Sequence, residues 1–110
     1  MTRVLFVCVA NAGRSQLAQA LYELRGGEAR SAGSRPAAEV HEAVIEALEE
    51  IGVDTSGRRP RQVTPDDVAW ADLVVDVDAW GLAEPVGLCL EEVRELRAAI
   101  ERRVAELPCS

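Results

Sequence analysis

One short segment, residues 4–17, constrains the fold of this chain more than any other. An apolar run from Val4 to Cys8 has the length of a buried strand, and a short turn containing Asn and Gly follows it. Arg14 then opens an amphipathic stretch with helical spacing of its leucines. The sequence therefore predicts a strand, a tight loop and a helix start in direct succession.

This loop has the properties of an anion-binding site. Backbone N–H groups converge in such a turn, the helix N-terminus adds positive potential, and a guanidinium offers a forked pair of donors to a tetrahedral oxyanion. A cysteine in the same field is favoured as a thiolate. We therefore expect Cys8 to act as a nucleophile facing an oxyanion, which would be bound by Val9, Ala10, Asn11, Ala12, Gly13 and Arg14.

The spacing Cys-x5-Arg-Ser between an apolar strand and a helix is more specific than either residue alone. Taken singly, a cysteine at the end of a core strand is a small buried hydrophobe, and an arginine near a helix start is usually solvated. The joint pattern favours catalysis over these structural roles.

The rest of the chain alternates strands and helices. Gly33 ends the second strand where it is expected to approach the loop closely. Thr64 and Pro65, with Asp67 three residues after the threonine, have the pattern of a helix start. We expect helices over 15–25, 40–51, a short stretch after 64 and 90–107, strands over 29–34 and 72–77, a polar surface connection over 54–62, and a loop over 80–85.

This alternation predicts an α/β fold with a single domain over residues 1–110. Short connections imply parallel strands with right-handed crossovers, hence a three-layer sandwich with a short parallel sheet of three or four strands and helices on both faces. Ligands bind beyond the carboxyl ends of such strands. Cys8 lies at one of these ends.

Composition limits the partners. The net charge of −7 disfavours nucleic acid and anionic membranes. Three cysteines, Cys8, Cys89 and Cys109, without a charged and apolar leader argue against a disulfide framework and for a cytoplasmic protein. His41 is the only histidine, so no metal site is expected, and it is interpreted as a capping or solvated residue.

The sequence resembles the low-molecular-weight protein tyrosine phosphatases and, more closely, the arsenate reductases that share their fold. The resemblance covers nearly the whole chain. Gln16 resembles the residue of the reductases at this position, because the phosphatases usually have proline there. The aromatic residues that follow Pro85 in the phosphatases and hold a tyrosine ring are missing, which also favours the reductases. The matching segments are Val-Cys-Val-Ala-Asn-Ala-Gly-Arg-Ser-Gln at 7–16, Ser-Ala-Gly-Ser-Arg-Pro at 31–36, Glu-Ile-Gly-Val-Asp-Thr-Ser-Gly at 50–57, Ala-Asp-Leu-Val-Val at 71–75 and Trp-Gly-Leu-Ala-Glu-Pro at 80–85.

The resemblance implies a role for each matching residue. Cys8 would be the nucleophile, Arg14 would bind the oxyanion in the ground and transition states, and Asn11 would hold the loop in shape. Ser15 would donate its hydroxyl to the thiolate. Glu84 stands where the family has the aspartate that protonates the leaving oxygen, and its side chain is one methylene longer.

The chain departs from the family between Asp78 and Ala79. Family members usually have a further stretch there, which forms a fourth strand and, in thioredoxin-coupled reductases, carries redox cysteines. We therefore expect the third strand to be an exposed edge, in a three-stranded sheet or in a homodimer paired along that edge.

The predicted reaction is thiol-dependent reduction of arsenate through an adduct with Cys8, with no bound cofactor. The electron donor would be an external small thiol, mycothiol or glutathione, followed by a glutaredoxin-like or thioredoxin-like reductase. Cys89 and Cys109 are alternative resolving thiols. Between apolar neighbours, Cys89 is expected to be buried, and Cys109 to be exposed in the tail. Two other functions stay open, a phosphatase acting through a Cys8 phosphoenzyme and a non-enzymatic oxyanion-binding module.

Overall fold

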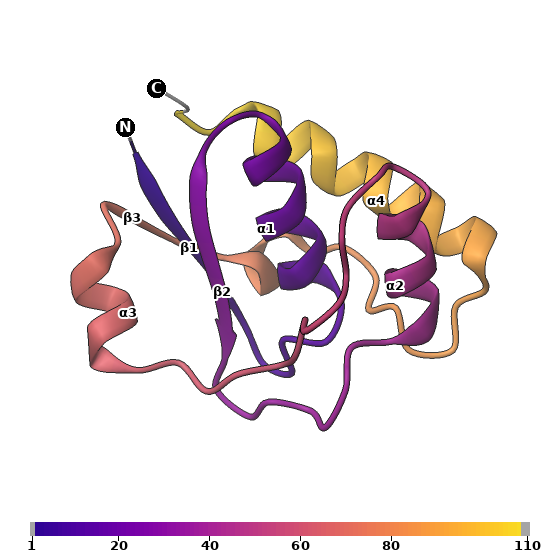
Figure 1. The fold of residues 1–110 in the computed structure, drawn as a ribbon, viewed down its shortest axis with the longest axis horizontal. Helices are drawn as coiled ribbons and strands as arrows, with labels where there is room; N and C mark the ends of the chain where they lie inside the picture. Colours follow the sequence, from indigo (N-terminus) through magenta and orange to yellow (C-terminus); the bar gives the residue numbers. More distant parts are fainter. Residues whose placement is uncertain (1, 109–110) are drawn as a thin grey trace.

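The computed structural model describes residues 2–108 of the chain, and strands and helices alternate along it (Figure 1). The predicted elements all form, with bounds that differ by up to two residues at most ends. A short 3₁₀ helix, η1, directly follows β3 and ends at the first residue of the predicted loop at 80–85. The elements are β1 (Arg3–Cys8), α1 (Arg14–Leu24), β2 (Glu28–Gly33), α2 (Glu42–Glu49), α3 (Pro65–Trp70), β3 (Leu73–Asp76), η1 (Val77–Trp80) and α4 (Leu90–Ala105).

The described strands form one parallel sheet with the order β2-β1-β3. Cys8 at the end of β1 lies opposite Gly33 at the end of β2. The predicted α/β fold and three-stranded sheet are confirmed. Within the described part of the chain β3 pairs only with β1, so it is an edge strand, and Val74 on it is exposed.

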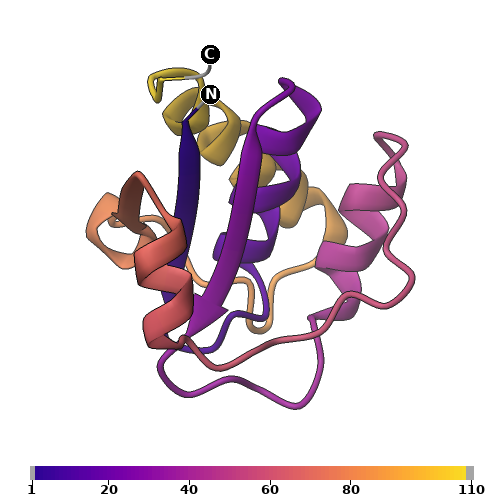
Figure 2. The same ribbon diagram turned by 60° about the vertical axis from the view of Figure 1, so that its left-hand side comes forward.

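Helices cover both faces of the sheet, as predicted, but unequally. Side chains alternate between the faces of a strand, and Val4, Phe6 and Cys8 belong to the main core together with residues of α1, α2 and α4. The fully buried Leu5 points to the other face, which the short helix α3 covers (Figure 2). The site at the end of β1 is thus supported mainly from the α1 side.

The longest helix, α4, closes the core and is tied to α2. Its residues Val93, Leu96, Ile100 and Val104 are buried against the α1 and α2 side of the core. Arg94 and Arg97 donate hydrogen bonds to Glu50 at the end of α2, and these bonds lower the pKa of Glu50 to about 2. Among the described helices none is both long and apolar enough to cross a membrane.

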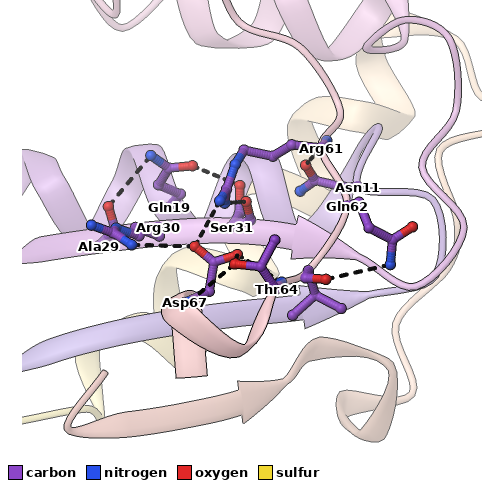
Figure 3. Close-up of polar contacts among 10 residues, drawn as sticks. Asn11, Gln19, Ala29, Arg30, Ser31, Arg61, Gln62, Thr64 and Asp67 are labelled. Carbon is purple, nitrogen blue, oxygen red and sulfur yellow. Dashed lines mark hydrogen bonds and ion pairs between the residues drawn. The ribbon is translucent and has the colours of Figure 1, made fainter. Parts of the chain in front are cut away.

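The start of α3 forms a polar network with β2 (Figure 3). Thr64 and Asp67 make the predicted reciprocal cap, in which the Thr64 hydroxyl accepts from the Asp67 N–H and the Asp67 carboxylate accepts from the Thr64 N–H. The same carboxylate, almost fully buried, also binds Arg61 at 2.6 Å and Arg30 at 3.2 Å. α3 is therefore fixed to the sheet by a charged cluster.

The connection over 54–62 differs from the expected surface loop. Its last part runs alongside the end of β2: Gly33 N–H donates to the Arg61 carbonyl, and Val63 N–H donates to the Gly33 carbonyl. Arg61 also donates its backbone N–H to Asn11. The end of this segment therefore extends the sheet beside Gly33 and also contacts the loop that follows β1.

Candidate active site

Cys8 lies at the end of β1, where its sulfur has two hydrogen-bond partners, Ser15 and Asn11. Its side chain is buried, with Sγ 2.9 Å from the Ser15 hydroxyl oxygen, and the Asn11 backbone N–H donates to the sulfur at 3.1 Å. The structure therefore brings together the predicted nucleophile and the predicted hydroxyl donor.

Asn11 connects the loop to its surroundings. Its φ of 52° is in the left-handed region that asparagine tolerates. Its side-chain amide donates to the Ser15 hydroxyl at 2.7 Å, and its side-chain oxygen accepts from Arg61 N–H at 3.0 Å. Gln16, also buried, donates to the Asn11 carbonyl at 3.0 Å and accepts from Arg58 at 3.0 Å. Gln16 thus supports the loop from behind, a role that the sequence did not reveal.

The hydrogen bonds of the loop carbonyls show in which direction the N–H groups of the loop point. The carbonyls of residues 8, 9, 10 and 12 all accept hydrogen bonds from the N–H groups of the segment 34–41. In a planar trans peptide the next N–H points the opposite way. The N–H groups of Val9, Ala10, Asn11 and Gly13 therefore point away from that segment, and the Asn11 N–H does reach the Cys8 sulfur. This arrangement suits an oxyanion beside Cys8.

Glycine is required where the loop meets β2. A Cβ on Gly33 would lie 2.4 Å from the carbonyl oxygen of Val9, which is impossible without movement. The close approach inferred from the sequence is therefore real. It lets the N–H groups of Ser34 and Arg35, directly after β2, donate to the carbonyls of Cys8 and Val9.

Arg14, the first residue of α1, carries the guanidinium of the site. Its side chain is 9% exposed and binds three groups of the following segment: Asp78 at 2.5 Å, Glu84 at 3.2 Å and the carbonyl of Leu82 at 3.1 Å. Glu84 was predicted to lie near the cysteine, and it does line the same cavity. Asp78 was not predicted to be a site residue. Its place two residues after β3, at the carboxyl edge of the sheet, is the signal that could have found it.

A small cavity of about 40 Å³ lies between the loop and the segment around Glu84. Pro85 is buried and closes it, since a Cβ on Gly13 would lie 2.1 Å from Pro85 Cγ. His41, interpreted from the sequence as a capping or solvated residue, stands at the start of α2 without a side-chain capping bond and lines this cavity. The cavity residues are Cys8, Ala10, Ala12, Gly13, Arg14, His41, Glu84, Pro85 and Val86.

The other two thiols differ from the first. Cys89 is exposed at the start of α4, so its expected burial between apolar neighbours was wrong. Its backbone N–H donates to the Glu92 carboxylate at 3.2 Å, so Cys89 is the residue that caps the start of this helix. Cys109 lies outside the described residues. A larger hollow of about 480 Å³ at the start of α2 is lined by none of the predicted site residues.

Comparisons with known proteins agree with this geometry. The profile of the family described as "Low molecular weight phosphotyrosine protein phosphatase" matches residues 3–80. A curated relative from Halobacterium salinarum, named putative arsenate reductase, is 40% identical, with 96% of this chain and 90% of the relative aligned.

Two solved structures are also similar. The thioredoxin-dependent arsenate reductase of Corynebacterium glutamicum is 35% identical, with a TM-score of 0.74 over 96% of this chain and 59% of that one. The arginine phosphatase YwlE of Geobacillus stearothermophilus is 25% identical, with a TM-score of 0.81 over 96% of this chain and 89% of that one. The fold is therefore shared by reductases and phosphatases.

Proposed function

Because the chain belongs to the low-molecular-weight phosphotyrosine protein phosphatase family, we propose that it uses this site to reduce arsenate to arsenite with thiols. The observation that carries the proposal is the cavity of about 40 Å³ with the Cys8 thiol and the Arg14 guanidinium in its wall. A small tetrahedral oxyanion matches this space, and Pro85 is not followed by aromatic residues that would hold the ring of a phosphate ester. The relatives named arsenate reductase support the same conclusion.

The first step is attack on arsenic. The Cys8 thiolate forms a sulfur–arsenic bond while Arg14 and the inward N–H groups of Val9, Ala10 and Gly13 hold the other oxygens. One arsenate oxygen leaves as water after taking a proton from Glu84, the general acid. Ser15 and Asn11 hold the sulfur through the hydrogen bonds described above.

The second step transfers electrons from a thiol. A thiol sulfur attacks Cys8, the sulfur–arsenic bond breaks, and its electron pair reduces arsenic from the +5 to the +3 state. Arsenite leaves, and a mixed disulfide on Cys8 is then reduced by another thiol. We propose a small thiol such as mycothiol or glutathione with a glutaredoxin-like or thioredoxin-like reductase, in the reducing cytoplasm.

The chain itself offers two alternative resolving thiols. Cys89 is exposed and therefore accessible to exchange with another thiol. Either Cys89 or Cys109 could take the place of the small thiol if the chain brought its sulfur to Cys8.

The decisive experiment measures conversion of arsenate to arsenite with a panel of thiols and reductases. We expect turnover in the parent and none in Cys8→Ser. If Cys89→Ser and Cys109→Ser keep parent turnover, the second thiol is external, whereas loss in either variant identifies an internal relay.

A second assay tests the alternative that the chain is a phosphatase, which its similarity to an arginine phosphatase also supports. We expect little release of phosphate from p-nitrophenyl phosphate, since no aromatic residues follow Pro85 to hold the ring. Hydrolysis faster than arsenate reduction would refute the proposed substrate class. Tight oxyanion binding without turnover by any thiol would instead indicate a binding module.

A further inference from the structure

Two carboxylates, Asp78 and Glu84, accept hydrogen bonds from the N–H donors with which Arg14 would bind an oxyanion. A guanidinium offers five N–H donors, and a parallel pair of bonds to an oxyanion uses either Nε with Nη2 or Nη1 with Nη2. Both edges therefore need a hydrogen on Nη2. Nη2 already donates to two carboxylates, to Asp78 at 2.5 Å and to Glu84 at 3.2 Å. An oxyanion can be bound by two parallel bonds only if one carboxylate gives up its place.

The two carboxylates are held very differently. Asp78 belongs to η1, whose residue Val77 is fully buried and whose Trp80 packs against Phe6 with ring centroids 6.3 Å apart. The Asp78 backbone N–H is itself fixed by a bond of 3.1 Å to the Asp76 carboxylate. The Asp78 side chain is 36% exposed. It is thus a short side chain on a well-packed turn.

Glu84, in contrast, is attached to a segment without regular structure between η1 and α4. Its side chain is 65% exposed. The distance from Arg14 Nη2 to the Glu84 carboxylate is 3.2 Å, which is longer than the 2.5 Å to Asp78. An exposed ion pair of this kind contributes little free energy and exchanges readily. Glu84 is therefore the carboxylate that an incoming oxyanion displaces most easily.

From these contacts we infer that Asp78 is the positioning residue of Arg14, and that oxyanion binding exchanges Glu84 for an oxygen of the substrate on Nη2. Asp78 keeps the guanidinium turned toward the cavity during the exchange. Glu84 is released beside the bound anion, where the proposed reaction needs its proton donor. The inference rests on the proposed oxyanion site, and it explains how Glu84 can be an Arg14 partner before binding and an acid afterwards.

The test compares two substitutions that each remove one negative charge next to Arg14. Protection of Cys8 against iodoacetamide is measured with increasing inorganic phosphate, and the Cys8 peptide is quantified by mass spectrometry. Electrostatics alone predicts tighter phosphate binding in both Asp78→Ala and Glu84→Gln. The inference predicts different outcomes for the two variants: the phosphate concentration for half protection rises about tenfold in Asp78→Ala, and it stays equal or falls in Glu84→Gln.

Two controls separate positioning from folding. Thermal unfolding and the alkylation rate without phosphate are measured for each variant, and the isosteric Asp78→Asn is expected to weaken phosphate binding in the same direction as Asp78→Ala. Phosphate binding to Asp78→Ala and Asp78→Asn as tight as to the parent would overturn the inference. So would an equal weakening in Glu84→Gln. No protection in the parent would overturn the oxyanion site itself, and the inference with it.

Discussion

Asp67 offers a sharp test of how the network at α3 supports the fold. Its carboxylate is almost fully buried and accepts hydrogen bonds from Arg61, Arg30 and both donors of Thr64. In Asp67→Asn the oxygen that faces Thr64 can be kept, but the other position becomes an amide N–H₂ that faces two guanidinium groups. The change therefore removes two charge-assisted bonds and leaves donors against donors.

The expected loss can be estimated from these contacts. A hydrogen bond to a charged group contributes about 1.5–3 kcal/mol, and the partial exposure of both arginines reduces this by screening. We expect Asp67→Asn to lower the free energy of unfolding by about 2 kcal/mol. The whole free energy of unfolding of a domain is usually about 5–15 kcal/mol. With a urea m-value of about 1–1.5 kcal/mol/M, the unfolding midpoint should fall by about 1.5 M.

The neighbouring Asp66 provides the matched control, because it is exposed on the same turn of α3. Asp66→Asn should change the free energy of unfolding by no more than about 0.5 kcal/mol. The assay is urea unfolding at pH 7, followed by far-ultraviolet circular dichroism. If the two variants unfold at the same urea concentration, the charged cluster does not stabilise the fold as argued.

The pH dependence adds a second check on the same residue. Burial raises the pKa of Asp67, but the bonds from Arg61 and Thr64 outweigh it and hold the pKa below 3.8. A carboxylate with a lowered folded pKa stabilises the protein above its unfolded pKa and loses this effect as the pH falls. The difference between parent and Asp67→Asn should thus be complete at pH 6 and shrink below about pH 3.8.

Two further predictions concern the cavity and the α2–α4 contact. Gly13→Ala places a Cβ 2.1 Å from Pro85 Cγ, so the segment with Glu84 must move. The rate of arsenate reduction should fall by about a hundredfold, with little change in the urea midpoint of unfolding. Turnover as fast as in the parent would contradict the described contact between Gly13 and Pro85. The pKa of Glu50 is lowered to about 2 by hydrogen bonds from Arg94 and Arg97, so its contribution to stability is present above pH 4.5 and lost towards pH 2. Urea midpoints of the parent and Glu50→Gln should differ at pH 6 and converge near pH 2, and a constant difference would rule out this ion pair.

Much of the fold followed from local patterns in the sequence. The apolar run ending at Cys8, the cap residues Thr64 and Asp67 and the glycine at 33 each predict a local backbone feature, and the structure has all of them. Such signals lie within a few residues of the feature that they predict. The open edge at β3 followed from the stretch that the family usually has after Asp78 and this chain lacks, whereas the order of the strands was first seen in the structure.

The partners of the site could not be predicted in the same way. Arg14 meets Asp78 and Glu84 across 64 and 70 residues of chain, and Arg58 meets Gln16 across 42. No short pattern encodes which side chains meet over such separations. The exposure of Cys89 was missed for a related reason, since apolar neighbours on each side do not determine where the middle side chain of a helix cap points.

The supports of the anion loop have a consequence for the biogenesis of the enzyme. The loop itself is short, but its shape depends on hydrogen bonds from residues 34–41 and from Arg61, and the guanidinium depends on residues that come after β3. A nascent chain that lacks these later segments therefore has Cys8 and the loop residues without the contacts that hold the loop in shape. The hydrogen-bonded setting of the Cys8 sulfur should be complete only when these later segments have folded against the loop.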